Sequence, residues 1–247
     1  MKDLGEAAYI LGFNIYRDRS RRLIGLSQST YLDKVLKKFK IDQSKKGFLS
    51  VLQGIKFSKT QCPATAEDRE QMSSVPYASA VGSIMYAMLC TRPDVSLAIS
   101  MAGRFQSNPG VDHWMAVKNI LKYLKRTKEM FLIYGGDKEL VVKGYVDTSF
   151  DTDSDDSKSQ ASYIFILNGG EVSWCSTKKS IVVDSICEAE YMAASEAAKE
   201  GVWMKQFMTD LGVVPSTLDP LTLLCDNTGA IALAKEPRFH KKTRHIK

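Results

Sequence analysis

Three carboxylates of this chain stand in segments that otherwise carry small or apolar side chains. Asp147 lies within the stretch LVVKGYVDTSF, Glu190 lies in the alanine-rich stretch CEAEYMAASEAAKEG, and Asp226 follows the short apolar run LTLLC. A half-buried carboxylate usually needs a positive partner, and a divalent metal ion is one such partner. The chemistry that these residue types suggest is therefore the binding of divalent cations by three acidic side chains.

Each carboxylate also fits a simpler role. Asp226 stands where it can cap the helix that follows, Asp147 fits a turn at a strand end, and Glu190 fits the first turn of a helix, where the dipole favours acidic groups. The residues that share the helix face of Glu190 are all small or apolar, so this face is expected to contact protein. They are Ala193, Ala194, Ala197, Gly201, Met204 and Met208.

Strands and helices alternate around these carboxylates. The pattern of 130–150 predicts two strands that flank the turn Gly135-Gly136-Asp137, and the pattern of 161–177 predicts a hairpin that turns at residues 168–170. A helix over 187–211, a short strand LTLLC and a short helix GAIALAKE follow. This order predicts a mixed α/β domain. Asp226 stands where a strand leads into a helix, and crevices at such strand ends are where α/β sheets bind ligands.

The first half of the chain has a different pattern. YILGFNIYRD and RLIGLSQ predict a hairpin that turns around residues 17–22, and STYLDKVLKKFKI predicts a helix capped by Ser29 or Thr30. Residues 42–76 are polar and show no period, which predicts a linker or extended loop. Residues 77–127 are expected to form helices, with a start at Pro93 and an amphipathic stripe from Trp114 to Leu124.

The composition is ordinary for a globular protein, with 44% hydrophobic and 25% charged residues. No apolar run is long enough to cross a bilayer, and the start MKDLGEAAYILGF lacks the continuous apolar stretch of a secretory signal. The five cysteines form no CxxC pair, which favours reduced, buried thiols. These features predict a cytoplasmic or nuclear protein without a membrane partner.

Basic residues concentrate near the end of the sequence, where they contribute to a net charge of +6. Such a cluster suits a nucleic-acid backbone, because neutralising phosphates releases counterions. A solvated basic tail explains the pattern equally well. The candidate nucleic-acid-binding residues are Lys235, Arg238, His240, Lys241, Lys242 and Arg244.

Several long stretches resemble Ty1/copia-type retrotransposon polyproteins, and plant elements most closely. KGYVDTSF, DDSKSQASYIFILNGGEVSWCS, EAEYMAASEAAKEGVWMK and LLCDNTGAIALAKEPRFHKKTRHI resemble the ribonuclease H domain. VPYASAVGSIMYAMLCTRPDVSLAISMAGRFQSNP resembles the segment before it, and MKDLGEAAYILGFNIYRD with YLDKVLKKF resembles the end of the reverse transcriptase. The resemblance implies a palm-end hairpin and thumb helix over 1–41, a linker and helical connection region over 42–128, and a C-terminally truncated ribonuclease H-like mixed sheet with flanking helices over 129–247.

The resemblance implies a mechanism and its partners. Asp147 corresponds to the aspartate of the first strand, Glu190 to the helix glutamate and Asp226 to the aspartate that follows the last strand. In that family such carboxylates hold two Mg²⁺ ions, which Mn²⁺ can replace, and the ions hydrolyse the RNA strand of an RNA–DNA hybrid. The hybrid and the remainder of the Pol polyprotein are therefore the expected partners.

The sequence also departs from the family pattern. Lys247 stands where a fourth carboxylate is expected, and residues 1–40 contain no Y-x-D-D motif, so DNA synthesis by this chain is not expected. Two other functions therefore stay open. One is a catalytically incomplete remnant that binds nucleic acid, and the other is a host-recruited interaction protein, including the secreted RxLR-type effectors under which related chains are sometimes catalogued.

Overall fold

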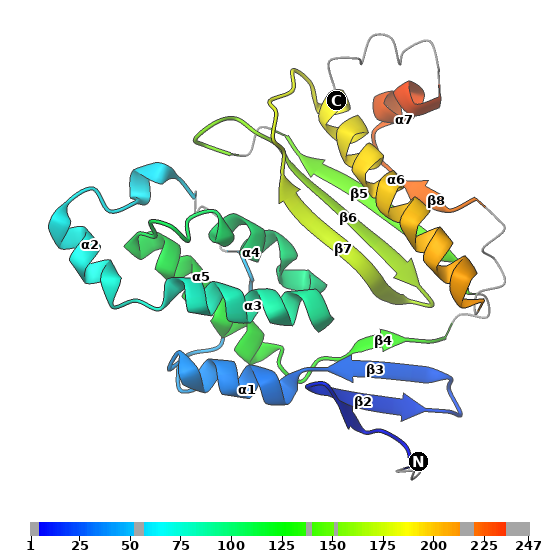
Figure 1. Ribbon diagram of the computed structural model, residues 1–247, viewed down its shortest axis with the longest axis horizontal. Coiled ribbons are helices and arrows are strands. Elements are labelled where there is room, and N and C mark those ends of the chain that lie inside the picture. Colours follow the sequence, from blue (N-terminus) through cyan, green and yellow to red (C-terminus); the bar gives the residue numbers. More distant parts are fainter. Residues whose placement is uncertain (1–4, 52–56, 137–139, 151–152, 213–219, 236–247) are drawn as a thin grey trace. The chain divides into compact units, whose positions relative to one another are not determined.

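The computed structural model describes residues 5–51, 57–136, 140–150, 153–212 and 220–235. Within these ranges the chain forms two four-stranded sheets and seven α-helices, which is a mixed α/β architecture (Figure 1). The chain divides into two units, Met1–Gly136 and Asp137–Lys247. This division falls beyond the expected boundary at residue 128 and joins the expected regions 1–41 and 42–128 in one unit.

The first unit contains an antiparallel sheet of order β1-β2-β3-β4. Its strands are β1 (Tyr9–Ile10), β2 (Phe13–Asp18), β3 (Leu23–Ser27) and β4 (Leu132–Tyr134). The hairpin around residues 17–22 is confirmed, because Asp18 pairs with Leu23. The expected hairpin across the turn 135–137 is wrong, because β4 pairs with β3 in the first unit.

Helices make up most of the rest of the first unit. They are α1 (Ser29–Lys38), η1 (Lys59–Gln61), α2 (Ala66–Ser73), α3 (Tyr77–Thr91), η2 (Pro93–Val95), α4 (Ser96–Gly103) and α5 (Val111–Arg126). Gln28 stands at the N-cap of α1, so the expected cap by Ser29 or Thr30 is wrong. Helix α2 lies in the segment expected to be a loop, and it begins with a capping box between Thr65 and Asp68.

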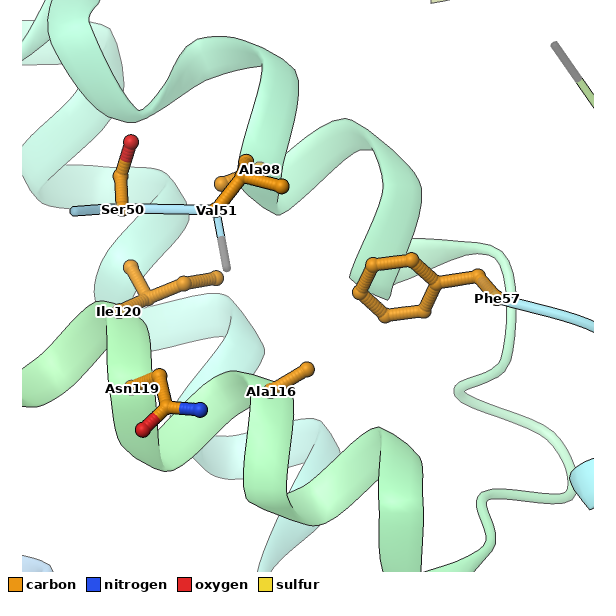
Figure 2. A pocket seen from close by; sticks show the side chains of 7 residues that line it. All are labelled: Ser50, Val51, Phe57, Ala98, Ala116, Asn119 and Ile120. Atoms are coloured by element: carbon orange, nitrogen blue, oxygen red, sulfur yellow. The ribbon is translucent and has the colours of Figure 1, made fainter. Parts of the chain in front are cut away.

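The core of the first unit is helical and closely packed. The stripe expected on α5 is buried, with Val117, Leu121 and Leu124 fully inaccessible to solvent. Figure 2 shows a small gap that side chains of α4, α5 and the loop after α1 enclose. Its volume is about 10 Å³, which is the space of about one water molecule. This gap therefore leaves no room for a ligand.

The second unit contains a sheet of order β7-β6-β5-β8 and two helices. Its elements are β5 (Val142–Ser149), β6 (Gln160–Leu167), β7 (Gly170–Lys178), α6 (Ile186–Leu211), β8 (Thr222–Leu224) and α7 (Thr228–Lys235). Strands β5, β6 and β7 are antiparallel, whereas β8 runs parallel to β5. The β6–β7 turn is confirmed, and the positive φ angles of Asn168 and Gly169 fit the short turn of such a hairpin.

Helix α6 packs along this sheet (Figure 1). Ser185 caps its start by accepting the backbone N–H of Glu188, and Gly212 ends it with a φ of 64°. Its small side chains Ala193 and Ala197 face Val146 of β5 and Phe165 of β6 in one buried cluster. The alanine-rich sequence therefore lets the helix approach the sheet closely and brings the first turns of α6 near the end of β5.

Gly144 of β5 leaves no space for a larger side chain. A Cβ atom there would lie 2.5 Å from Cε1 of Phe165 and 2.8 Å from Cδ1 of Leu223. Gly144→Ala is expected to destabilise the second unit by about 1–3 kcal/mol, because a packed core resists an added methyl group. Gly82→Ala is the control, because nothing lies within 4 Å of its Cβ position in α3, and a gain of about 0.5–1 kcal/mol is expected there. Urea unfolding followed by tryptophan fluorescence measures both changes, and equal effects would contradict the packing argument.

Candidate functional site

Glu190 lies in the second turn of α6 and is buried, with 4% of its surface exposed. The acidic residue of the first turn is Glu188, which accepts the backbone N–H of Asp184, so the dipole explanation applies to Glu188 rather than to Glu190. The hydroxyl of Thr148 donates to the carbonyl of Ala189 at 3.5 Å and ties this part of the helix to β5. Glu190 is therefore held at the end of β5 by the packing of its helix.

Asp147 lies in β5, and Asp226 follows the neighbouring parallel strand β8. Tyr145 of β5 pairs with Leu224 of β8, so each aspartate stands two residues beyond this last pair of the two strands. Asp226 does not cap α7, because Asn227 does so: the Asn227 Oδ1 atom accepts the backbone N–H of Ala230 at 3.0 Å. Both aspartates are exposed, and the cap role considered for Asp226 is wrong.

Two of the three carboxylates lie close together, with a thiol beside them. Ligand atoms of Glu190, Cys225 and Asp226 all lie within 4.8 Å of one another. The Cys225 Sγ atom lies 3.9 Å from Oε2 of Glu190. Asp147 is outside this group of three but acts on the charge of Glu190. Sequence reasoning placed Cys225 among buried structural thiols and missed its position beside the carboxylates.

The surroundings of Glu190 make ionisation of its carboxyl group less favourable than in water. Burial, followed by the negative charges of Asp147 and Asp226, raises the pKa of Glu190 above its ordinary value. Hydrogen bonds from the Thr148 backbone and the Cys225 thiol act in the opposite direction. Within 140–150, 153–212 and 220–235, no lysine or arginine forms an ion pair with any of the three carboxylates. The site therefore concentrates negative charge that a divalent cation would compensate.

The backbone of β5 orients the exposed aspartate. The N–H of Thr148 donates to Oδ1 of Asp147 at 2.8 Å. The pKa of the Cys225 thiol is also raised, first by burial and then by the three nearby carboxylates, against a backbone hydrogen bond from Asn227. The thiol is therefore a neutral neighbour of the carboxylates in the absence of a cation.

A second acidic group, near the start of β6, has a structural role. Asp153 and Asp156 each accept Lys178 Nζ at 2.7 Å, and Asp156 also pairs with Lys158. These lysines hold the pKa of Asp156 well below its usual range. Asp153 is buried, whereas acidic residues of a loop are usually solvated. These aspartates are already compensated and do not form a second cation site.

The predicted basic cluster lies almost entirely beyond the described residues. Lys235 is the last residue of α7. Arg238, His240, Lys241, Lys242, Arg244 and Lys247 fall in 236–247, outside the described ranges. No helix among the described residues is long and apolar enough to span a membrane.

Comparisons with known proteins define the class of this chain. The Retrovirus-related Pol polyprotein from transposon TNT 1-94 of Nicotiana tabacum is 43% identical over 246 residues, which cover 100% of this chain and 18% of that polyprotein. The polyprotein from transposon RE2 of Arabidopsis thaliana is 35% identical over 69% of this chain and 12% of its own length. The chain belongs to the Ty1/copia-type retrotransposon Pol polyproteins.

The chain spans less than a fifth of the length of these polyproteins. The Secreted RxLR effector protein 161 of Plasmopara viticola is similar over a shorter segment. It is 45% identical over 135 residues, which cover 54% of this chain and 94% of that protein. No family model and no solved structure matches the chain.

Proposed function

We propose that the second unit is a ribonuclease H-like domain that hydrolyses the RNA strand of an RNA–DNA hybrid. One observation carries the proposal. Buried Glu190 meets Asp226, and Asp147 lies near enough to raise its pKa, at the ends of two parallel strands. A fold tolerates a buried carboxylate beside two others when a cation compensates them.

The topology and the family support the same reaction. The site lies at the carboxyl end of β5, where an antiparallel sheet changes to a parallel strand pair, and such changes in sheet order commonly form ligand crevices. Membership of the Pol polyproteins makes nucleic acid the expected substrate and the rest of the polyprotein the expected partner. The 2′-hydroxyl is the group that distinguishes the RNA strand from DNA.

The donor set fits Mg²⁺, with Mn²⁺ as a substitute, because hard oxygen ligands prefer these ions. Asp147, Glu190 and Asp226 would hold the metal, which when bound activates water and stabilises the leaving oxygen. The protein contributes position: α6 fixes Glu190, and the Thr148 N–H donates to Oδ1 of Asp147 and orients this carboxylate. The burial of Glu190 beside two other carboxylates, which raise its pKa, is the observation that fits a cation here.

The direct test compares four labelled duplexes of the same sequence in Mg²⁺: the hybrid labelled on RNA, the hybrid labelled on DNA, double-stranded RNA and double-stranded DNA. Only the RNA strand of the hybrid should be cut, and EDTA should stop the reaction. A hybrid that is bound but not cut in Mg²⁺ or Mn²⁺ would instead identify a non-catalytic nucleic-acid-binding remnant.

The similarity to a secreted effector supports a second candidate function, that of an interaction protein. The segment in common covers nearly all of that protein. This function predicts that the chain neither binds nor cuts the hybrid and instead copurifies with one protein partner in fixed stoichiometry. Hybrid binding at nanomolar to micromolar concentration would count against it.

Cys225 predicts how the site responds to softer metals. A thiolate beside two carboxylates prefers Cd²⁺ or Zn²⁺ over Mg²⁺. The Cys225 Sγ atom lies within 4.8 Å of ligand atoms of Glu190 and Asp226. Cd²⁺ is expected to inhibit hybrid cleavage in Mg²⁺, and Cys225→Ser is expected to raise the inhibiting concentration about tenfold or more, since thiolate is the preferred ligand. Cys90→Ser in the first unit is the control. Equal inhibition of all three proteins would show that Cys225 does not reach the metal.

A further inference from the structure

Helix α3 carries no charge on any side. Its sequence, YASAVGSIMYAMLCT, has small, apolar and neutral polar residues only. One side is buried in the core of the first unit, with Ala80, Val81 and Ile84 fully inaccessible to solvent. A surface helix normally carries charged or polar residues opposite its buried side, and a helix that is apolar all round is normally covered by protein. The outer side of α3 lacks the polar surface that water would favour.

This outer side exposes three large side chains, Met85, Tyr86 and Leu89, which are 39%, 41% and 64% accessible. They follow Gly82 by three, four and seven positions, so all four residues share one face of the helix. Nothing lies within 4 Å of the position that a Cβ atom on Gly82 would take. The missing side chain lets another backbone approach α3 closely at this point.

The turn between β1 and β2 extends the same surface. The Tyr86 hydroxyl lies 3.8 Å from the position that a Cβ atom on Gly12 would take. Cys90 is the main cause of the raised pKa of Tyr86, and Tyr9 is close enough to contribute. Tyr9 and Leu11 are 53% and 82% exposed. The residues of this surface, the α3 face, are Tyr9, Leu11, Gly82, Met85, Tyr86 and Leu89.

The α3 face is large enough for a specific contact. With about 200 Å² for each large side chain, the exposed fractions correspond to roughly 550 Å². An apolar patch of this size is at the upper end for a monomer and commonly marks a contact site. Two copies that meet through it would bury roughly 1,100 Å² together, above the limit of about 1,000 Å² for a specific interface.

The lack of charge distinguishes between occupants. A charged partner, such as a polyanion or a basic peptide, would lose hydration on this face and gain no ion pair. Two identical surfaces avoid this cost, and they meet without like-charge repulsion because neither carries a charge. The ammonium group of Lys38 donates to the Ser79 hydroxyl at 2.8 Å, beside the exposed stripe rather than within it.

We propose that two copies of this chain associate through the α3 face, with their α3 helices packed across a two-fold axis near Gly82 and Met85. The inference goes beyond the proposed nuclease, because it concerns the first unit and needs neither a metal nor a nucleic acid. An interface of this modest area corresponds to a dissociation constant of about 1–100 µM.

Sedimentation velocity of the whole chain tests the proposal, between about 0.1 and about 200 µM, a range that brackets the expected dissociation constant. The variant is Gly82→Arg. The chain has room for this side chain, and arginine favours a helix more than glycine does, so the fold is kept. In the dimer it would place like charges on an apolar contact, and the dissociation constant should rise at least about thirtyfold.

Leu49→Arg is the matched control. It adds the same charge at a 52% exposed apolar residue of the same unit, outside the α3 face, and it should change the dissociation constant less than about twofold, as is usual for surface sites. Leu89→Arg is a second variant on the α3 face, where the side chain is already mostly exposed. It should weaken association as Gly82→Arg does.

Hydroxyl-radical oxidation shows where the contact lies. Met85 and Met115 have similar exposure, 39% and 43%, but only Met85 belongs to the α3 face. Oxidation of Met85 should fall about threefold between dilute and concentrated protein, whereas that of Met115 should not change, because oxidation of methionine follows its exposure.

Three results would overturn the proposal. They are a wild-type chain that stays monomeric over the whole range, equal weakening by Gly82→Arg and Leu49→Arg, and Met85 that stays as reactive in the dimer as in the monomer. A monomer that binds phosphatidylcholine vesicles, and loses this binding in Gly82→Arg, would assign the α3 face to a lipid surface instead. Each result stands whether or not the second unit cuts a hybrid.

Discussion

We expect Asp226→Asn to lower the rate of hybrid cleavage in Mg²⁺ by about 10³-fold or more. The substitution keeps the shape of the side chain and removes one of the anionic groups within 4.8 Å of the Glu190 ligand atoms. Metal stabilisation of a phosphoryl transition state contributes several kcal/mol, and about 4 kcal/mol corresponds to this factor. Single-turnover cleavage at saturating protein measures the chemical step without the binding step.

The matched control is Asp210→Asn on α6. Asp210 is exposed and accepts the Gln206 side chain at 2.8 Å, away from the three carboxylates. Its substitution should change the rate less than about twofold, as is usual for surface sites. Hybrid affinity in EDTA should be equal in both variants. Cleavage that persists in Asp226→Asn would remove the nuclease assignment from this site.

The sequence was enough to predict that Glu190 is buried, because the spacing of apolar residues on a helix face can be recognised within one short stretch of sequence. Residues three and four apart share a face, so the alanines and methionines that follow Glu190 in the chain are enough to identify the buried side of α6. These side chains determine which face of the helix is buried, and Glu190 is buried because it lies on the same face. The same argument predicted the buried stripe of α5.

Strand pairing and polar helices were less predictable. The stretch before Gly135 was correctly predicted as a strand, but the alternation of its side chains does not tell which strand it pairs with. In the structure this strand, β4, pairs with β3, which lies more than a hundred residues earlier in the chain. Helix α2 has no apolar stripe, so periodicity missed it. The Thr65–Asp68 capping box was the available signal, since both side chains satisfy backbone N–H groups that start a helix.

The residues next to Asp226 show that the sequence did not predict which individual side chain has which role. Cys225, Asp226 and Asn227 are consecutive, and a helix cap can be assigned to either polar residue from sequence. The structure gives the cap to Asn227 and leaves Asp226 with Cys225 beside Glu190. This depends on the parallel register of β5 and β8, which no local pattern encodes.

Glu190→Gln is expected to stabilise the metal-free chain at neutral pH, by an amount on the order of 1 kcal/mol, whereas most substitutions destabilise. The raised pKa of Glu190 means that the folded state prefers the protonated form. The contribution of this group to stability is therefore fully present below the ordinary glutamate pKa and is lost as pH rises through the raised value. Glutamine does not titrate, so the difference between the proteins should vanish near pH 4 and grow toward pH 7.

Urea unfolding in EDTA and in Mg²⁺ separates a metal site from an ordinary buried acid. The wild-type chain should gain stability from Mg²⁺ by mass action, whereas Glu190→Gln should gain little, because a ligand that binds only the folded state stabilises it. Glu196→Gln on the same helix is the control with the opposite sign: Glu196 pairs with buried Lys179 at 2.6 Å, so its loss should destabilise the chain at pH 7. A wild-type chain that is stabler than Glu190→Gln in EDTA at pH 7, with no response to Mg²⁺, would mean that Glu190 is held by contacts within the fold and that no cation belongs there.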